Sequence, residues 1–113
     1  MMHTVVETSS YMADAKILLG EDGMRRVADA VAANPALGDL MAGTGGFRKF
    51  RAARPGMGKR GGVRVISIYR DERWPVFLFA VFAKNEKSNV SAAERNALKK
   101  MADSIFDTYG AKR

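Results

Sequence analysis

Cysteine is absent from this chain of 113 residues, and histidine occurs only once, as His3. Without a thiol the chain can form neither a disulfide nor a thiolate metal site, which fits a reducing cytoplasm. One imidazole near the N-terminus also argues against a zinc site and against a Ser-His-Asp relay. We therefore expect no metal and no cofactor, and any catalysis must use other side chains.

Long apolar runs are missing too, because the longest unbroken one is the eight residues from Val76 to Ala83. A membrane-spanning helix needs about 20 such residues, and the N-terminus lacks the basic start and apolar stretch of a signal peptide. The sequence thus predicts a cytoplasmic protein with no membrane partner. At this length we expect residues 1–113 to form a single domain.

Acidic side chains are scarce, with 12 against 19 Lys and Arg, and the formal net charge is +7. The imbalance is concentrated in residues 47–87, which hold eleven basic and only three acidic side chains. Residues 1–46 instead carry three basic and six acidic ones. A dense positive field of this kind attracts a polyanion such as nucleic acid, although charge alone gives affinity and no chemistry.

Apolar periodicity and turn residues divide the chain into strands and helices. The expected strands cover residues 3–7, 47–53, 63–70 and 75–84, and the expected helices cover residues 11–19, 22–33 and 91–109. Residues 37–46 form a glycine-punctuated connection. Short turns between the last three strands favour antiparallel neighbours. The sequence therefore predicts an α+β fold, with an antiparallel meander sheet, an N-terminal helical hairpin and a C-terminal helix.

The helix ends carry signals of their own. Ser9 or Ser10 can cap the first helix and Asp22 the second, and Ser91 with Glu94 has the spacing of a capping box. The apolar stripe of the last helix is expected at Leu98, Met101, Ile105 and Phe106.

The last strand is apolar in both of its phases, so it should lie inside the sheet with both faces covered. Simple alternation would place Val76, Leu78, Ala80 and Phe82 on one face and the residues between them on the other.

Counting along the two expected hairpins places Arg51 opposite Arg64, and Arg64 opposite Val81 or Phe82, with Lys84 at the same end of the sheet. Arg64 also shares a strand phase with two isoleucines, which puts a guanidinium on an otherwise apolar face. Directly opposed cations destabilise a sheet. Such a cluster therefore suggests a function, such as gripping phosphate.

The strand from Phe47 to Arg51 interleaves aromatic and cationic side chains, a pattern suited to stacking a base while holding its phosphate. The alternative, which we favour for Phe47 and Phe50, is that both rings belong to the core. The loop of residues 54–62 is rich in glycine and carries Lys59 and Arg60, but its spacing does not match a Walker A loop.

Three stretches in succession, Gly43 to Arg51, Gly58 to Ile66 and Ala83 to Ser88, are similar to the signatures of HigB-type toxins in the RelE/ParE superfamily. The resemblance implies a compact RelE-like domain that acts as the toxin of a bacterial type II toxin-antitoxin pair. It further implies a ribosome-dependent endoribonuclease that cleaves mRNA in the A site, and a cognate antitoxin, often one with a helix-turn-helix DNA-binding domain.

Within this resemblance, Arg64 corresponds to the strand arginine that holds the scissile phosphate, and Lys84 to Lys87 correspond to the basic motif after the last strand. Ser91 stands where RelE has a tyrosine, so the general acid and base remain open. A lysine among cations can lose its proton near neutral pH, which makes Lys84 or Lys59 a candidate for proton transfer. We favour a surface ion pair for Glu86.

The resulting candidates fall into two groups. The expected catalytic residues are Arg51, Lys59, Arg64 and Lys84, and the expected RNA-binding residues are Arg48, Lys49, Arg54, Arg60 and Lys87. Two other functions stay open at this point: a ParE-like inhibitor of DNA gyrase, and a nucleic-acid-binding protein without enzymatic activity.

Overall fold

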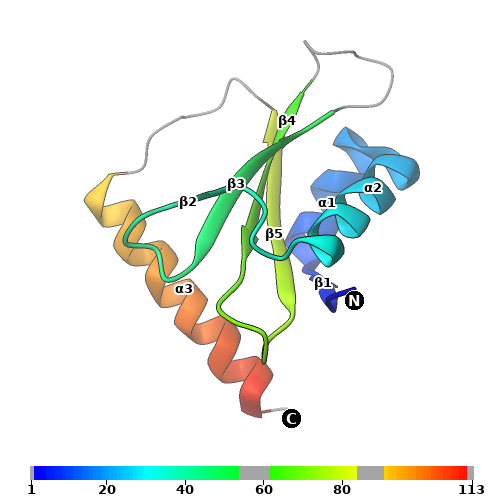
Figure 1. The fold of residues 1–113 in the computed structure, drawn as a ribbon. Helices are drawn as coiled ribbons and strands as arrows, with labels where there is room; N and C mark the ends of the chain where they lie inside the picture. Colours follow the sequence, from blue (N-terminus) through cyan, green and yellow to red (C-terminus); the bar gives the residue numbers. More distant parts are fainter. Residues whose placement is uncertain (1, 54–61, 84–90, 112–113) are drawn as a thin grey trace.

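The computed structural model describes residues 2–53, 62–83 and 91–111. They form a sheet with the strand order β1-β5-β4-β3-β2, flanked by helices (Figure 1). The elements are β1 (Val5–Glu7), α1 (Ser9–Leu18), α2 (Gly20–Ala33), β2 (Asp39–Leu40), β3 (Phe47–Ala52), β4 (Val63–Ile68), β5 (Val76–Ala83) and α3 (Ala92–Ala111). The predicted α+β architecture, with its helical hairpin and C-terminal helix, is confirmed.

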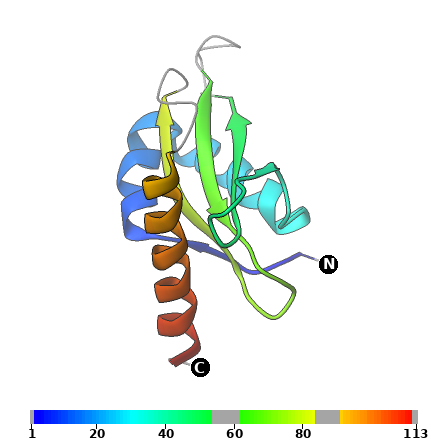
Figure 2. The ribbon, with the colours of Figure 1, turned by 90° about the vertical axis from the view of Figure 1, so that its left-hand side faces the viewer.

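The two faces of the sheet are covered by different helices. The hairpin of α1 and α2 covers one face, which we call the hairpin face, and α3 covers the other, the α3 face (Figures 1 and 2). Along β4, Val63 and Val65 join the core under the hairpin, whereas Ile66 and Ile68 join Phe106 in the core under α3. Alternate residues of the central strands thus serve two apolar cores.

A β-bulge interrupts the pairing of β4 with β5. Ile66 pairs with Ala80 but Ser67 pairs with Leu78, so Phe79 has no opposite residue on β4. An extra residue reverses the alternation beyond it, and Ala80 and Phe82 accordingly pack toward the α3 core while Leu78 packs under the hairpin. The expectation of simple alternation along β5 was therefore wrong beyond residue 79.

Both edges of the sheet differ from a plain meander. At one edge β1 pairs with β5 in parallel, with Val5 opposite Val76. At the other, part of the segment expected as a connection forms β2, in which Asp39 pairs with Lys49 of β3. The interior position predicted for β5 is confirmed, since it lies between β1 and β4.

The first two helices do not use the expected caps. α1 is capped by Thr8, whose Oγ1 accepts a hydrogen bond from Tyr11 N at 3.3 Å and donates one to Leu78 O at 2.9 Å. One hydroxyl therefore starts the helix and ties it to β5. α2 begins at Gly20 without a side-chain cap, and Asp22 lies within its first turn.

α3 begins with the predicted capping box. Ser91 Oγ accepts from Glu94 N at 3.2 Å, and Glu94 Oε1 accepts from Ser91 N at 3.1 Å. Ala102 and Phe106 are buried against the sheet, but Met101 is 44% exposed, so its place in the expected apolar stripe was wrong. No helix within the described ranges is long and apolar enough to cross a membrane.

Tyr11 is a buried polar group at the centre of the hairpin core. Its side chain is fully buried, and its hydroxyl has no hydrogen-bond partner within the described part of the chain. Burial, with a smaller contribution from the carboxylate of Glu7, raises the pKa of Tyr11 above its ordinary value.

Replacing Tyr11 by phenylalanine is expected to raise the free energy of unfolding by about 1 kcal/mol at neutral pH, because it removes an unpaired buried hydroxyl. The wild type should also lose stability as pH rises above about 10, where only the unfolded chain ionises this tyrosine freely. The variant has no ionisable group at this position, so its stability should not fall for this reason. Urea unfolding of both proteins at pH 7 and pH 10.5 tests this, and a less stable variant at pH 7 would contradict it.

Candidate nucleic-acid interface

The predicted pairing of arginines across the sheet is confirmed. Arg51 of β3 is directly opposite Arg64 of β4, and Arg64 is directly opposite Phe82 of β5. Directly opposed side chains on antiparallel strands have Cβ atoms about 5 Å apart. Two guanidinium groups and one aromatic ring therefore form a row across three adjacent strands, which we call the Arg-Arg-Phe row.

This row lies on the α3 face. Arg64 has the phase of Ile66, and Arg51 and Lys49 have the phase of Phe47, which is buried under α3. Arg51 is exposed, while Lys49 and Arg64 are half-buried. The strand ends that carry Arg51 and Arg64 extend beyond the first turn of α3 (Figure 2). The helix thus covers the lower part of this face and leaves the cationic end open.

Among the described residues, no carboxylate forms an ion pair with the two arginines of the row. Like charges directly opposed across a sheet repel each other, and the part of the chain that the structure describes offers no ion pair to offset this repulsion. A phosphate group would relieve this repulsion, because a guanidinium can donate two parallel hydrogen bonds to its oxygens.

The aromatic member of the row is not one of the two phenylalanines singled out in the sequence. Phe47 is fully buried and Phe50 packs against the hairpin core, which confirms that both are core residues. Phe82 reaches the α3 face only because of the β-bulge at Phe79. It is half-buried and lies beside Arg64.

One carboxylate at this surface was not predicted from the sequence. Asp39 is directly opposite Lys49, and opposed residues share a face, so its side chain belongs to the α3 face. Gly38 makes this pairing possible: its φ is +99°, and a Cβ on it would lie 2.5 Å from Lys49 O. A strand of two residues is too short to show an alternation of polar and apolar side chains. Gly38 was therefore the one sequence feature that could have indicated this pairing.

Arg48 is separated from the other cations of β3. Its phase is that of Phe50 and Ala52, on the hairpin face. Arg48 Nη1 donates to Gly38 O at 3.2 Å, and its Nε is buried without a partner among the described residues. The structure thus brings Lys49, Arg51 and Arg64 together but leaves Arg48 on the opposite side.

The remaining candidates lie outside the described residues. They are Arg54, Lys59, Arg60, Lys84 and Lys87.

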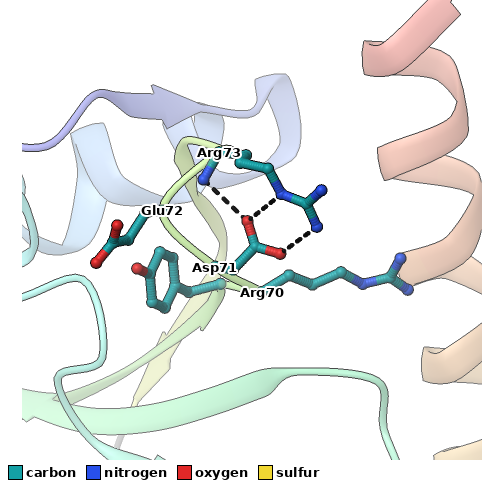
Figure 3. A pocket seen from close by; sticks show the side chains of 5 residues that line it. Arg70, Asp71, Glu72 and Arg73 are labelled. Atoms are coloured by element: carbon teal, nitrogen blue, oxygen red, sulfur yellow. Dashed lines mark hydrogen bonds and ion pairs between the residues drawn. The ribbon is translucent and has the colours of Figure 1, made fainter.

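A shallow hollow lies at the turn between β4 and β5 (Figure 3), lined by Tyr69, Arg70, Asp71, Glu72 and Arg73. Its charges are largely paired: Asp71 accepts from Arg73 N at 2.9 Å, Nε at 3.2 Å and Nη2 at 3.0 Å. These hydrogen bonds lower the pKa of Asp71. The hollow is at the opposite end of β4 from Arg64, so it is separate from the Arg-Arg-Phe row.

The fold is similar to that of a solved toxin. A double-arginine mutant of E. coli toxin RelE in its free state superposes with a TM-score of 0.56, at 18% identity, over 89% of this chain and 97% of that one. At 18% identity, this similarity is evidence for a shared fold alone.

A family comparison adds the sequence evidence. The family described as the RelE toxin of the RelE/RelB toxin-antitoxin system matches residues 21–112, which include the Arg-Arg-Phe row and the whole of the sheet except β1. A match over most of the chain shows the family, and this protein belongs to the RelE toxins.

Proposed function

We propose that this RelE-family toxin, of the HigB-like kind, is a metal-independent endoribonuclease that cleaves mRNA in the ribosomal A site and so inhibits translation. The Arg-Arg-Phe row is the single observation that carries this proposal. It offers a phosphate two guanidinium groups that form no ion pair among the described residues and, beside them, the half-buried Phe82 for contact with a base.

The row suits the electrostatic part of RNA cleavage. The 2′-oxygen attacks the adjacent phosphorus as its proton leaves, the bond from phosphorus to the 5′-oxygen breaks, and that oxygen takes up a proton. The products are a 2′,3′-cyclic phosphate and a 5′-hydroxyl. Arg51 and Arg64 stabilise the charge that develops on the phosphate oxygens, a contribution of about 3 to 4 kcal/mol for one well-placed donor.

The site has few side chains that can transfer a proton. We assign proton transfer to Lys84 or Lys59, because a lysine among cations can exchange a proton near neutral pH. Lys49 completes the phosphate contacts on the α3 face. With so few proton-transfer groups, the site depends on a substrate that is already oriented, and the A site holds its codon in a fixed position.

A toxin of this kind requires neutralisation in the cell. We propose a cognate antitoxin that presents acidic side chains to the basic sheet and carries a helix-turn-helix DNA-binding domain. Charge complementarity favours this partner, because residues 47–87 hold eleven basic and three acidic side chains.

The purified protein is expected to cleave mRNA on programmed ribosomes at least about 100-fold faster than naked mRNA, because the ribosome supplies the orientation. Primer extension in a reconstituted translation reaction measures both rates and maps the cuts. Equal rates would contradict ribosome dependence. No cleavage by folded protein in either reaction would contradict the ribonuclease, and a gyrase supercoiling assay would then test the ParE-like alternative.

A further inference from the structure

One flank of α3 carries two cations beside the loop that joins β2 to β3. A Cβ on Gly43 would lie 3.6 Å from Arg95 Cδ, and a Cβ on Gly45 would lie 3.5 Å from Lys99 Cγ. Gly45 also has a φ of +80°, a conformation that favours glycine. The loop therefore passes close along this side of the helix, against the side-chain stems of Arg95 and Lys99.

Hydrogen bonds of Thr44 shape this loop. Thr44 is fully buried, and its Oγ1 donates to Met41 O at 2.6 Å while accepting from Phe47 N at 3.2 Å. These hydrogen bonds join the loop to the start of β3, so the loop places the side of α3 that carries Arg95 and Lys99 beside this strand.

Both cations are open to solvent. Arg95 and Lys99 are exposed, and neither forms an ion pair within the described ranges. A spacing of four residues places them one above the other on a helix. Arg95 also lies in the first turn of α3, where the helix dipole disfavours a cation. Helix stability does not explain its presence there, whereas an anionic partner does.

These cations continue the charge of the sheet. The N-terminal end of α3 points toward the strand ends that carry Arg51 and Arg64 (Figures 1 and 2). Lys99 lies at the level of Gly45. Arg95 lies about one helical turn, roughly 6 Å, closer to those strand ends. Lys49 lies two strand residues beyond Phe47, about 7 Å, in the same direction. Arg95 therefore lies at about the level of Lys49, and Lys99 lies about one helical turn farther from the Arg-Arg-Phe row.

We propose that Arg95 and Lys99 form a second phosphate-binding site, which holds the backbone of the same RNA strand whose scissile phosphate lies at the Arg-Arg-Phe row. This inference rests on the proposed function for the identity of the strand. It assigns α3 a role in binding the RNA backbone next to the nucleotides at the cleaved bond. The expected effect of the site is on affinity and on its dependence on salt.

The test compares two double variants that each remove two exposed cations. Arg95→Gln with Lys99→Gln removes the proposed site, and Arg25→Gln with Arg26→Gln removes the same charge from α2, on the hairpin face. The probes are a single-stranded oligoribonucleotide of about 16 nucleotides and a dinucleotide, both 2′-O-methylated so that they cannot be cleaved. Fluorescence anisotropy measures the dissociation constant at several salt concentrations.

For the long probe, the α3 variant is expected to bind about tenfold more weakly than the wild type. Its plot of log affinity against log salt should be shallower by about 1.4, since each contacted phosphate contributes about 0.7. The short probe should bind both proteins equally, because it fills only the Arg-Arg-Phe row. The α2 variant should resemble the wild type with either probe.

Equal affinities and salt slopes for wild type and α3 variant would overturn the proposal, as would an equal loss in the α2 variant. A defect seen only on ribosomes, with none on the long probe, would also overturn it, because the cations would then contact another RNA. Cleavage by the wild type on ribosomes is scored separately. Failure of that activity with normal binding of the long probe would therefore reject the ribonuclease and leave the second site standing.

Discussion

Replacing Arg64 by alanine is expected to lower ribosome-dependent cleavage by at least about 100-fold, with the fold unchanged. Arg64 is the middle member of the Arg-Arg-Phe row, between Arg51 and Phe82. Its replacement therefore removes the guanidinium group that lies next to both of them. Loss of one fixed donor at a developing charge typically costs a factor of about 100 to 1000 in rate. Its half-buried position should allow the alanine to fold.

Two variants make this result interpretable. Arg64→Lys keeps the charge but loses the planar pair of donors, so it should recover only part of the activity. Arg25→Ala removes an exposed arginine from α2 and should cleave like the wild type. Primer extension gives the rates, and thermal unfolding checks the fold of each protein. Wild-type cleavage by Arg64→Ala would remove this residue from the site.

Replacing Phe106 by alanine is expected to lower the free energy of unfolding by about 3 to 5 kcal/mol. Its ring is 2% exposed and lies edge-on to Trp74 at 5.1 Å and to Phe77 at 5.5 Å. The guanidinium of Arg70 lies 4.3 Å from the ring centroid and also donates to Asp103 at 2.6 Å. The substitution leaves a cavity and removes the contacts of this ring with Trp74, Phe77 and Arg70.

The matched control lies five residues earlier on the same helix. Met101 is 44% exposed, so Met101→Ala should change the free energy of unfolding by less than about 0.5 kcal/mol. Urea titration followed by circular dichroism measures both variants. A small loss for Phe106→Ala would mean that α3 contributes little to global stability, and the core under α3 would then have to be assigned differently.

The register of the basic strands could be predicted because both of its determinants are local. Short connections bring β3, β4 and β5 together as antiparallel neighbours, and Arg64 in phase with two isoleucines fixes its face. The capping box of α3 was predicted for the same reason, since Ser91 and Glu94 are three residues apart. Patterns within a few residues are sufficient for such features.

The composition of the site depended on contacts that local patterns do not record. β5 is apolar in both phases, so nothing in its sequence indicates the bulge at Phe79 that turns Phe82 toward Arg64. The position of Asp39 opposite Lys49 depends on a pairing of two residues. Met101 fits a helical stripe as well as Ala102 does, and only the direction from which the sheet approaches decides between them.

The parallel pairing of β1 with β5 links folding to the order of synthesis. Val5 cannot meet Val76 until β5 has been made, and closing so long a loop costs more entropy than forming the hairpins of β3, β4 and β5. The edge of the sheet that β1 forms therefore stays open until the ribosome has synthesised β5. A nascent chain that stops short of Val76 lacks the strand on which its first strand assembles.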